Sequence, residues 1–304
     1  MKIGALFYVT GHTIDPAGLG RALEDAGFES LWLPEHGILP VTPSQAYPMT
    51  GGPIPKVYGQ MADPFVTLGF AAAATSTLRL GTCVCIVPEH HPLRLAKQVS
   101  TLDSFSGGRF LFGVGAGWLR NEVEAFGADF STRWTYTREA VDAMKALWRD
   151  GSAGYEGDIV RFEPVIVEPI PAQRPHPPVL LGAQTSEATF RRIAAWADGW
   201  IAYGVTPEQL KAARVAIADE CHKIGRDPDE IEVSAGVRDA TPAIQDAFEE
   251  AGAARLILSL YNNPGDPIPL DQWPDAALAS HTGGPPSADD TLHAIEKIAK
   301  LAEL

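Results

Sequence analysis

GGRFLFGVGAGWLRNEVEAFG, which runs from Gly107 to Gly127, contains a strand, a tight turn and the start of a helix in immediate succession. Residues 110–114 are mostly apolar and favour an extended strand, whereas Trp118 and Leu119 begin a charged amphipathic helix. The glycines of the intervening step are Gly113, Gly115 and Gly117. Glycines at the carboxyl end of a strand let the backbone pass close to a flat or large group. The same glycines also fit a plain turn without a ligand, because short glycine patterns are weak signals.

The strand–turn–helix order repeats on both sides of this segment. The eight predicted strands are residues 3–8, 30–33, 78–87, 110–114, 178–181, 199–202, 231–235 and 255–260. Each is followed by a helix, or by a loop and then a helix, and several of these helices begin at a proline. Alternating strands and helices indicate a parallel sheet. Eight such units in 304 residues predict a closed (β/α)8 TIM barrel that forms a single domain over residues 1–304.

Three segments depart from this rhythm. Alternating residues 155–167, with a turn at Gly157-Asp158, predict a hairpin inserted between the fourth and fifth strands. Long loops rich in proline and glycine are predicted after the second strand, residues 37–61, and after the eighth, residues 261–286. Long loops in compact folds usually serve function or are disordered.

Composition excludes several classes of partner. The chain is 45% hydrophobic and 20% charged, and its net charge of −14 argues against nonspecific nucleic-acid binding and against an anionic membrane surface. There is no signal-peptide pattern, and no apolar run reaches the ~18 residues of a transmembrane helix. Cys83, Cys85 and Cys221 are predicted to be buried free thiols without a metal, and an odd cysteine count suits a reducing cytoplasm.

The unusual side chains gather where strands end. Glu35-His36 follows the second predicted strand, His90-His91 the third, the glycine step the fourth, and residues 182–186 the fifth. Active sites of (β/α)8 barrels lie at the carboxyl ends of the strands. The clustering therefore predicts an enzyme.

Several of these segments, in this order, resemble the bacterial luciferase-like superfamily of flavin- and deazaflavin-dependent oxidoreductases. The resemblance rests on GFESLW (27–32) before Glu35-His36, RLGT (79–82) before His91-Pro92, DSFSGGR (103–109) before GVGAGW (113–118), Pro178 to Gly182, and ADGW (197–200). It covers nearly the whole chain and includes the inserted hairpin. It implies a barrel that binds FMN or the deazaflavin coenzyme F420, and members with this overall pattern look more like the F420 users.

The resemblance also implies particular backbone and side-chain features. The family has a non-proline cis peptide bond after the third strand, which by position is Cys83-Val84, where a small bulge would support the central ring of the cofactor. F420-dependent glucose-6-phosphate dehydrogenases of this superfamily use a histidine at the end of strand two, matched here by His36. They also carry a glutamate directly after the glycine step, where this chain has Trp118. That departure argues against sugar-phosphate oxidation and leaves cofactor binding untouched.

His36 is the candidate catalytic acid or base, because an imidazole titrates near neutral pH. The competing interpretation is a core histidine beside a proline-rich loop. Glu35 either orients His36 or caps a loop, and it is assigned to the substrate pocket together with His91 and Trp118. Trp118 either walls that pocket or is buried beneath its helix. His90 and His91 are neighbours that point to different sides, so a two-histidine metal site is not expected, and His91 is placed nearer the cofactor.

Two glycine-containing turns are assigned to the cofactor. Gly182, Ala183, Gln184, Thr185 and Ser186 precede a helix, whose N-terminal N–H groups can hold a phosphate, although Thr185 or Ser186 can equally be an ordinary N-cap. Gly115, Ala116 and Gly117 either pass under the cofactor or form a plain turn.

We expect F420-dependent hydride transfer to or from a small organic substrate. Tyr47, Tyr58, Tyr261 and Trp273 in the two long loops indicate a largely apolar pocket. The alternative is an FMN-dependent monooxygenase that receives reduced flavin from a partner reductase, and a lesser one is a non-catalytic cofactor-binding protein. Homodimers are common in the family that the chain resembles.

Overall fold

The parallel strands of the chain close into a barrel in the computed structural model, which describes residues 1–263 and 265–304. The barrel strands are β1 (Lys2–Leu6), β2 (Ser30–Leu33), β3 (Arg79–Thr82) continued by β4 (Cys85–Ile86), β5 (Phe110–Gly115), β8 (Val179–Gly182), β9 (Gly199–Tyr203), β10 (Glu232–Val237) and β11 (Arg255–Ser259). Neighbouring strands pair in parallel, and the pairings β1–β11 and β3–β5 close the ring. The predicted (β/α)8 barrel is confirmed.

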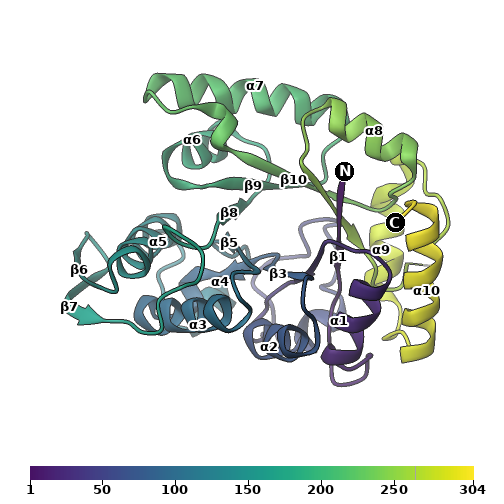
Figure 1. Cartoon of the computed structure of the whole chain (residues 1–304), viewed down its shortest axis with the longest axis horizontal. Coiled ribbons are helices and arrows are strands. Elements are labelled where there is room, and N and C mark those ends of the chain that lie inside the picture. Colours follow the sequence, from purple (N-terminus) through teal and green to yellow (C-terminus); the bar gives the residue numbers. More distant parts are fainter. Residues whose placement is uncertain (264) are drawn as a thin grey trace.

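Helices surround the strands (Figure 1). They are α1 (Pro16–Asp25), α2 (Pro64–Ala74), α3 (Pro92–Phe105), α5 (Arg133–Asp150), α6 (Glu187–Trp196), α7 (Pro207–Lys223), α8 (Pro242–Glu250) and α10 (Ala288–Leu301). Proline at the first helical position and a capping side chain before it explain why several starts were predictable. Asp15 accepts a hydrogen bond of 2.8 Å from the N–H of Gly18 at the start of α1, and Asp63 accepts one of 2.8 Å from Val66 at the start of α2.

The predicted hairpin insertion is confirmed. Strands β6 (Ser152–Glu156) and β7 (Arg161–Ile166) pair in antiparallel fashion, and the N–H of Gly157 donates to the carbonyl of Val160 across the turn at 2.9 Å. The hairpin projects beyond α5 at the left of Figure 1. It therefore extends one side of the barrel and leaves the ring of strands intact.

Two predicted boundaries near the carboxyl ends of the strands were wrong. The continuous strand predicted over residues 78–87 ends at Thr82, bulges at Cys83-Val84, resumes as β4 and turns into the 3-10 helix η2 (Val87–Glu89). The helix predicted to begin at Trp118 is α4 (Arg120–Ala125), because Leu119 keeps an extended backbone with φ −91° and ψ 106°. Trp118 thus lies in the loop before α4, and its ring contacts the neighbouring segment at His36.

The two long loops contain helical segments. Residues 37–61 include the 3-10 helix η1 (Lys56–Gly59). The loop predicted over residues 261–286 was wrong in part, because it contains η4 (Leu270–Gln272) and the helix α9 (Trp273–Thr282). Residue 264, which that prediction covered, lies outside the described residues.

A buried charge cluster lies at the strand starts. Arg255, which is 0% exposed, makes two hydrogen bonds of 2.8 Å to Glu29 and one of 2.5 Å to Glu232. Burial opposes these charges, but the ion pairs outweigh it, so the pKa of each carboxyl is lowered and the pKa of Arg255 is raised. The cluster ties β11 to the segments that precede β2 and begin β10.

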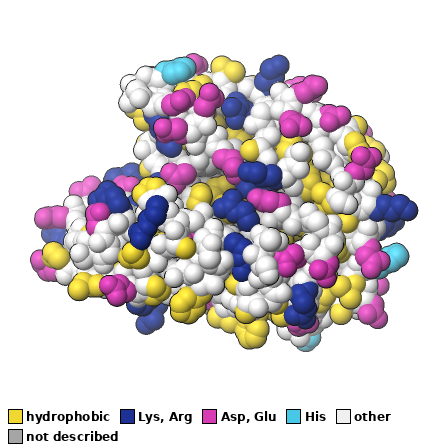
Figure 2. All heavy atoms as spheres, in the orientation of Figure 1, with side chains coloured by type: hydrophobic (Ala, Val, Ile, Leu, Met, Phe, Trp, Pro, Cys, Tyr) yellow, Lys and Arg dark blue, Asp and Glu magenta, His cyan; other side chains and the backbone are white. Residues whose placement is uncertain are grey.

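Charged side chains of both signs are mixed over the face shown in Figure 2, with acidic groups beside basic ones. This distribution differs from the continuous basic surface of a nucleic-acid-binding protein. Within the described residues, none of the helices combines the length and the apolar character needed to cross a bilayer.

Candidate active site

His36 lies just after β2 and is hydrogen-bonded to a buried carboxylate. Its Nδ1 is 2.8 Å from Oε2 of Glu122 on α4, and the two side chains are only 6% and 1% exposed. The ring of Tyr58 lies against the imidazole with a centroid separation of 4.8 Å, and that of Trp118 at 5.8 Å. His36 is therefore a partly enclosed imidazole whose orientation is set by a carboxylate and two aromatic rings.

Glu35 faces away from His36 and holds the neighbouring strand. Its Oε2 accepts a hydrogen bond of 2.6 Å from the N–H of Ile86, and its Oε1 lies 2.9 Å from Nε2 of His90. Of the two roles considered for Glu35, the structure supports the capping of a loop, whereas Glu122 is the residue that contacts His36.

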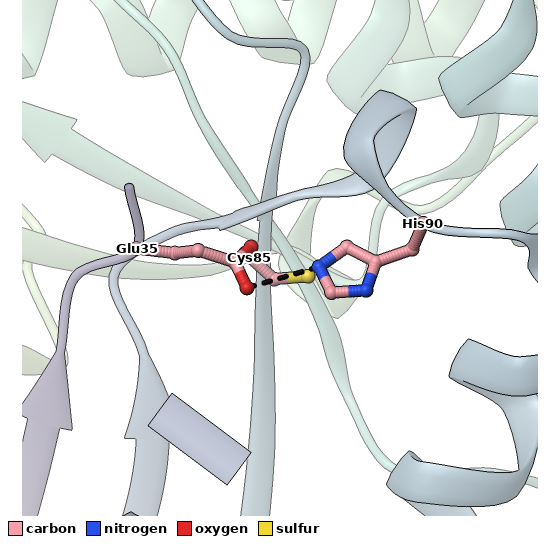
Figure 3. A group of neighbouring side chains, drawn as sticks. All are labelled: Glu35, Cys85 and His90. Atoms are coloured by element: carbon pink, nitrogen blue, oxygen red, sulfur yellow. Dashed lines mark hydrogen bonds and ion pairs between the residues drawn. The ribbon is translucent and has the colours of Figure 1, made fainter. Parts of the chain in front are cut away.

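Glu35, Cys85 and His90 form a compact group with ligand-type atoms within 4.8 Å of one another (Figure 3). A metal would require the thiolate, but burial, followed by the charge of Glu35, raises the pKa of Cys85. Burial of His90 favours its neutral form, yet its hydrogen bond to Glu35 and the charge of that group raise its pKa overall. Through Glu35, this group forms a hydrogen-bonded network that joins the end of β2 to β4 and to the end of η2.

Glu89 is a second buried acid near His36. Burial, and then the negative charges of Glu122 and Glu35, raise its pKa to about 9. Its Oε2 accepts a hydrogen bond of 3.3 Å from the N–H of Gly37, and its Oε1 has no hydrogen-bond partner within the described part of the chain. At neutral pH Glu89 is therefore an uncharged carboxylic acid.

The segments assigned to the cofactor converge on one side chain. Cys83-Val84 is a cis peptide bond, as predicted. Val84 then packs between two glycines, because a Cβ added to Gly115 would lie 2.6 Å from one of its methyl groups, and a Cβ added to Gly182 only 2.3 Å from the other. The structure thus brings the ends of β3, β5 and β8 together around the bulge. Burial raises the pKa of Cys83 to about 12, so its thiol is neutral there.

The rest of the glycine step is followed by a cationic region. Ala116 is buried, and Gly117 has φ +74°, a conformation that glycine adopts without strain. The carbonyl of Gly117 accepts a hydrogen bond of 3.1 Å from Nε of Arg133. Arg192 stacks on the ring of the next residue, Trp134, at 4.2 Å. Burial and then the neighbouring arginines lower the pKa of Arg133, which indicates positive charge gathered beside this turn.

The turn between β8 and α6 contains an ordinary cap. Ser186 accepts a hydrogen bond of 3.1 Å from the N–H of Thr189, as an N-cap residue does. The carbonyl of Ala183 accepts from the indole of Trp200 at 3.1 Å, whereas the side chains of Gln184 and Thr185 are exposed. The turn is therefore held by two hydrogen bonds and keeps polar side chains accessible.

His91 lies apart from these groups. Its Nδ1 accepts from the N–H of Leu93 at the start of α3, and its exposed ring borders a surface cavity of about 510 Å³ between α3 and the β7 edge. The structure therefore does not bring His91 to His36, although the prediction that His90 and His91 point to different sides is confirmed.

One polar network at the site was missed from sequence. Tyr8, just after β1, is 2.9 Å from Nε2 of His281 on α9, and Nδ1 of that imidazole is 3.0 Å from the hydroxyl of Tyr47. Tyr47 in turn bonds to the hydroxyl of Tyr58 at 2.8 Å, and Tyr58 packs on His36. Burial, followed by the charge of Arg238, lowers the pKa of His281 to about 4. A neutral imidazole therefore joins α9 to the loop over residues 37–61.

A model of the luciferase-like monooxygenase family matches residues 15–303. This chain belongs to that family. As a luciferase-like protein it is 38% identical over 309 residues to the uncharacterized protein Rv0953c of Mycobacterium tuberculosis, with 99% of each chain covered. It is also 32% identical over 170 residues to the FMNH2-dependent dimethylsulfone monooxygenase of Pseudomonas putida. The matched region covers 53% of this chain and 46% of that enzyme.

The barrel of this luciferase-like protein is also found among solved structures. One is an F420-dependent secondary alcohol dehydrogenase in complex with an F420-acetone adduct, which superposes with a TM-score of 0.71 at 17% sequence identity. The superposition covers 99% of this chain and 97% of the dehydrogenase chain. At that identity the likeness establishes the fold.

From the sequence, Glu122 was predicted only as part of a charged amphipathic helix. The signal that could have singled it out is its place one turn after the glycine step, on the helix that follows β5. Within this luciferase-like chain the carboxylate near the candidate histidine therefore comes from Glu122, although position 118 holds tryptophan.

Proposed function

We propose that this protein is an F420-dependent oxidoreductase that transfers a hydride to or from a small, largely apolar organic substrate, with His36 exchanging the accompanying proton. The observation that carries the proposal is the connection between His36 and the glycine cradle, which is formed by Gly115 and Gly182 packed on Val84. Trp118 contacts His36 and directly follows Gly117, while Val84 packs on Gly115 in the same turn. The acid–base group and the cradle are thus parts of one surface.

The residues at the cradle suit a flat cofactor with an anionic side chain. The residues proposed to hold it are Cys83, Val84, Gly115, Ala116, Gly117, Gly182, Ala183, Gln184, Thr185 and Ser186. Val84, seated on two glycines, and a neutral thiol present an uncharged surface to a ring system. Arg133 and Arg192 supply positive charge beside Gly117. When bound, a deazaflavin supplies a carbon that accepts or donates hydride.

The side chains around His36 favour an apolar substrate. Tyr58 and Trp118 cover its ring, and Tyr47 lies 6.3 Å from the ring of Trp118. Trp118 is therefore the pocket wall that the geometry supports best. Glu35, whose two oxygens are already hydrogen-bonded, and His91, which borders the outer cavity, are less suited to that role.

Titration of the purified protein with oxidised F420 and with FMN tests the cofactor. Micromolar binding of F420 with much weaker binding of FMN supports the proposal, and anaerobic turnover with alcohols, enones and imines then defines the substrate. We expect His36→Ala to lower turnover at least about tenfold with cofactor affinity little changed. His293→Ala, at an exposed position on α10, is the matched control. Unchanged turnover in His36→Ala would remove His36 from the mechanism.

The second candidate is an FMN-dependent monooxygenase supplied by a reductase. The similarity to the Pseudomonas putida enzyme over part of the chain favours it. Preference for FMN, together with turnover that stops without O2, would establish this alternative. Tight cofactor binding without any turnover would instead indicate a cofactor-binding protein.

A further inference from the structure

We propose that Glu122 is the positioning residue for His36, holding the imidazole proton on Nδ1 so that Nε2 is the atom that exchanges a proton with substrate. This inference rests on the proposed function, since it gives His36 a proton-transfer role. Its basis is the 2.8 Å contact between Nδ1 and the Glu122 carboxylate, both of them buried.

The proposed tautomer follows from the donors and acceptors of the two groups. When the Glu122 carboxyl is ionised it only accepts hydrogen bonds, so the hydrogen between the two groups then lies on Nδ1. A neutral imidazole carries a single N–H, and its other nitrogen is then an acceptor. Nε2 of His36 can therefore take a proton from a bound hydroxyl, and the resulting imidazolium would face the Glu122 carboxylate. In the reverse direction the same Nε2–H is donated to a carbonyl oxygen.

The other buried polar groups nearby leave Glu122 as the carboxyl that contacts His36. Glu89, from η2, is neutral at pH 7 because its pKa is about 9. Both carboxylate oxygens of Glu35 are hydrogen-bonded, one to the N–H of Ile86 and one to His90. From η1, Tyr58 contributes a phenol whose pKa is raised by burial and by the neighbouring tyrosines, so it is uncharged as well. Oε1 of Glu122 has no hydrogen-bond partner among the described residues, and His36 is the partner of Oε2.

Trp118 and Glu122 both contact His36 from the segment that follows β5. The indole occupies the position directly after the glycine step and contacts His36 with its ring at 5.8 Å. Glu122 lies four residues further along, on the first turn of α4, from which its side chain reaches Nδ1. The tryptophan thus shields the pair on one side, and the carboxylate approaches from another.

Nitrogen NMR of the His36 ring in protein without cofactor tests the proposal. In the wild type we expect the signature of the Nδ1–H tautomer. Glu122→Gln should give a mixture of tautomers, because an amide can either accept from or donate to Nδ1. Glu124→Gln is the matched control, because Glu124 is exposed on the same helix and pairs with Arg120, and it should leave the tautomer unchanged.

The kinetic expectation is a fall in kcat/KM of at least about tenfold in Glu122→Gln, with cofactor affinity unchanged within about twofold. Glu122→Asp, which keeps the charge, should recover part of the loss. The same tautomer in wild type and Glu122→Gln would overturn the positioning role even if the enzyme reduces or oxidises substrate with F420. Altered ring signals in a protein that neither binds F420 nor turns over would keep the Glu122–His36 pairing and overturn the proposed proton transfer.

Discussion

Gly182→Ala tests whether Val84 is held in the cradle by close approach to two glycines. The added Cβ would lie 2.3 Å from a methyl carbon of Val84. Carbon atoms prefer separations of about 3.5–4.0 Å, so the valine must retreat by more than about 1 Å. Overpacking of this kind costs about 1–3 kcal/mol. We expect the free energy of unfolding in urea to fall by that amount. If the displaced side chain enters the cofactor surface, the dissociation constant of the preferred cofactor rises by about 5- to 150-fold.

A double-mutant cycle locates the effect. Val84→Ala removes the methyl group that clashes, so Gly182→Ala should cost about 1 kcal/mol less in the Val84→Ala background than alone. Gly69→Ala on α2, where a Cβ meets no heavy atom within 4 Å, is the control. It should stabilise by about 0.5–1 kcal/mol, as alanine does in a helix. Additive costs, or wild-type stability and binding in Gly182→Ala, would refute the reasoning about the cradle.

Three further predictions concern buried ionisable groups. Arg255→Met should lower the free energy of unfolding at pH 7 by about 3 kcal/mol, since it leaves Glu29 and Glu232 unpaired. Both carboxyls have lowered pKa values in the folded protein, and protonation removes the ion pairs. The difference in stability from wild type should therefore shrink below pH 4.5. The pKa of Glu89 is raised from 4.5 to about 9, so the folded protein binds one proton more than the unfolded chain between these values. The free energy of unfolding should therefore fall as pH rises across that interval. Urea unfolding at pH 6 and at pH 9 should show this loss in wild type and not in Glu89→Gln. His281 has a pKa lowered from 6.5 to about 4, so stability should fall as pH drops across that interval; His281→Gln should lose less stability between pH 7 and pH 4.

Exposed ion pairs provide the controls for these measurements. Arg149→Met removes a pair with Asp150 on the surface of α5 and should change stability by less than about 1 kcal/mol. A similar loss in Arg149→Met and Arg255→Met would contradict the importance given to burial. A Glu89→Gln variant with the same pH dependence as wild type would show that Glu89 ionises normally in the fold.

Local signals were sufficient for the elements of the barrel. The strand over residues 110–114, the proline-started helices and the turn at Gly157-Asp158 depend on residues within a few positions of one another. Hydrophobic period, capping and turn chemistry act over that range, so a single sequence contains the information. The cis peptide bond was placed correctly at Cys83-Val84 only through the family resemblance.

Helix α9 shows where local signals were insufficient. Residues 273–282 lie in a stretch with prolines and few long apolar side chains, and the pattern lacks a clear apolar period. The helix is held by tertiary contacts, such as the stacking of Trp273 on Phe248 with a centroid separation of 6.2 Å and an interplanar angle of 5°. Tertiary packing of this kind overrides weak helix propensity.

The sequence by itself determined the order of the elements and the kinds of side chain at the carboxyl ends of the strands, including His36 and the glycine step. Only the tertiary structure decided which of these side chains meet. His36 pairs with Glu122, 86 positions away, and turns from its chain neighbour Glu35, while Tyr8 reaches His281 across 273 positions. The physical reason is that closure of the barrel brings together segments distant in the chain, and a hydrogen bond depends on position in space within a few tenths of an ångström.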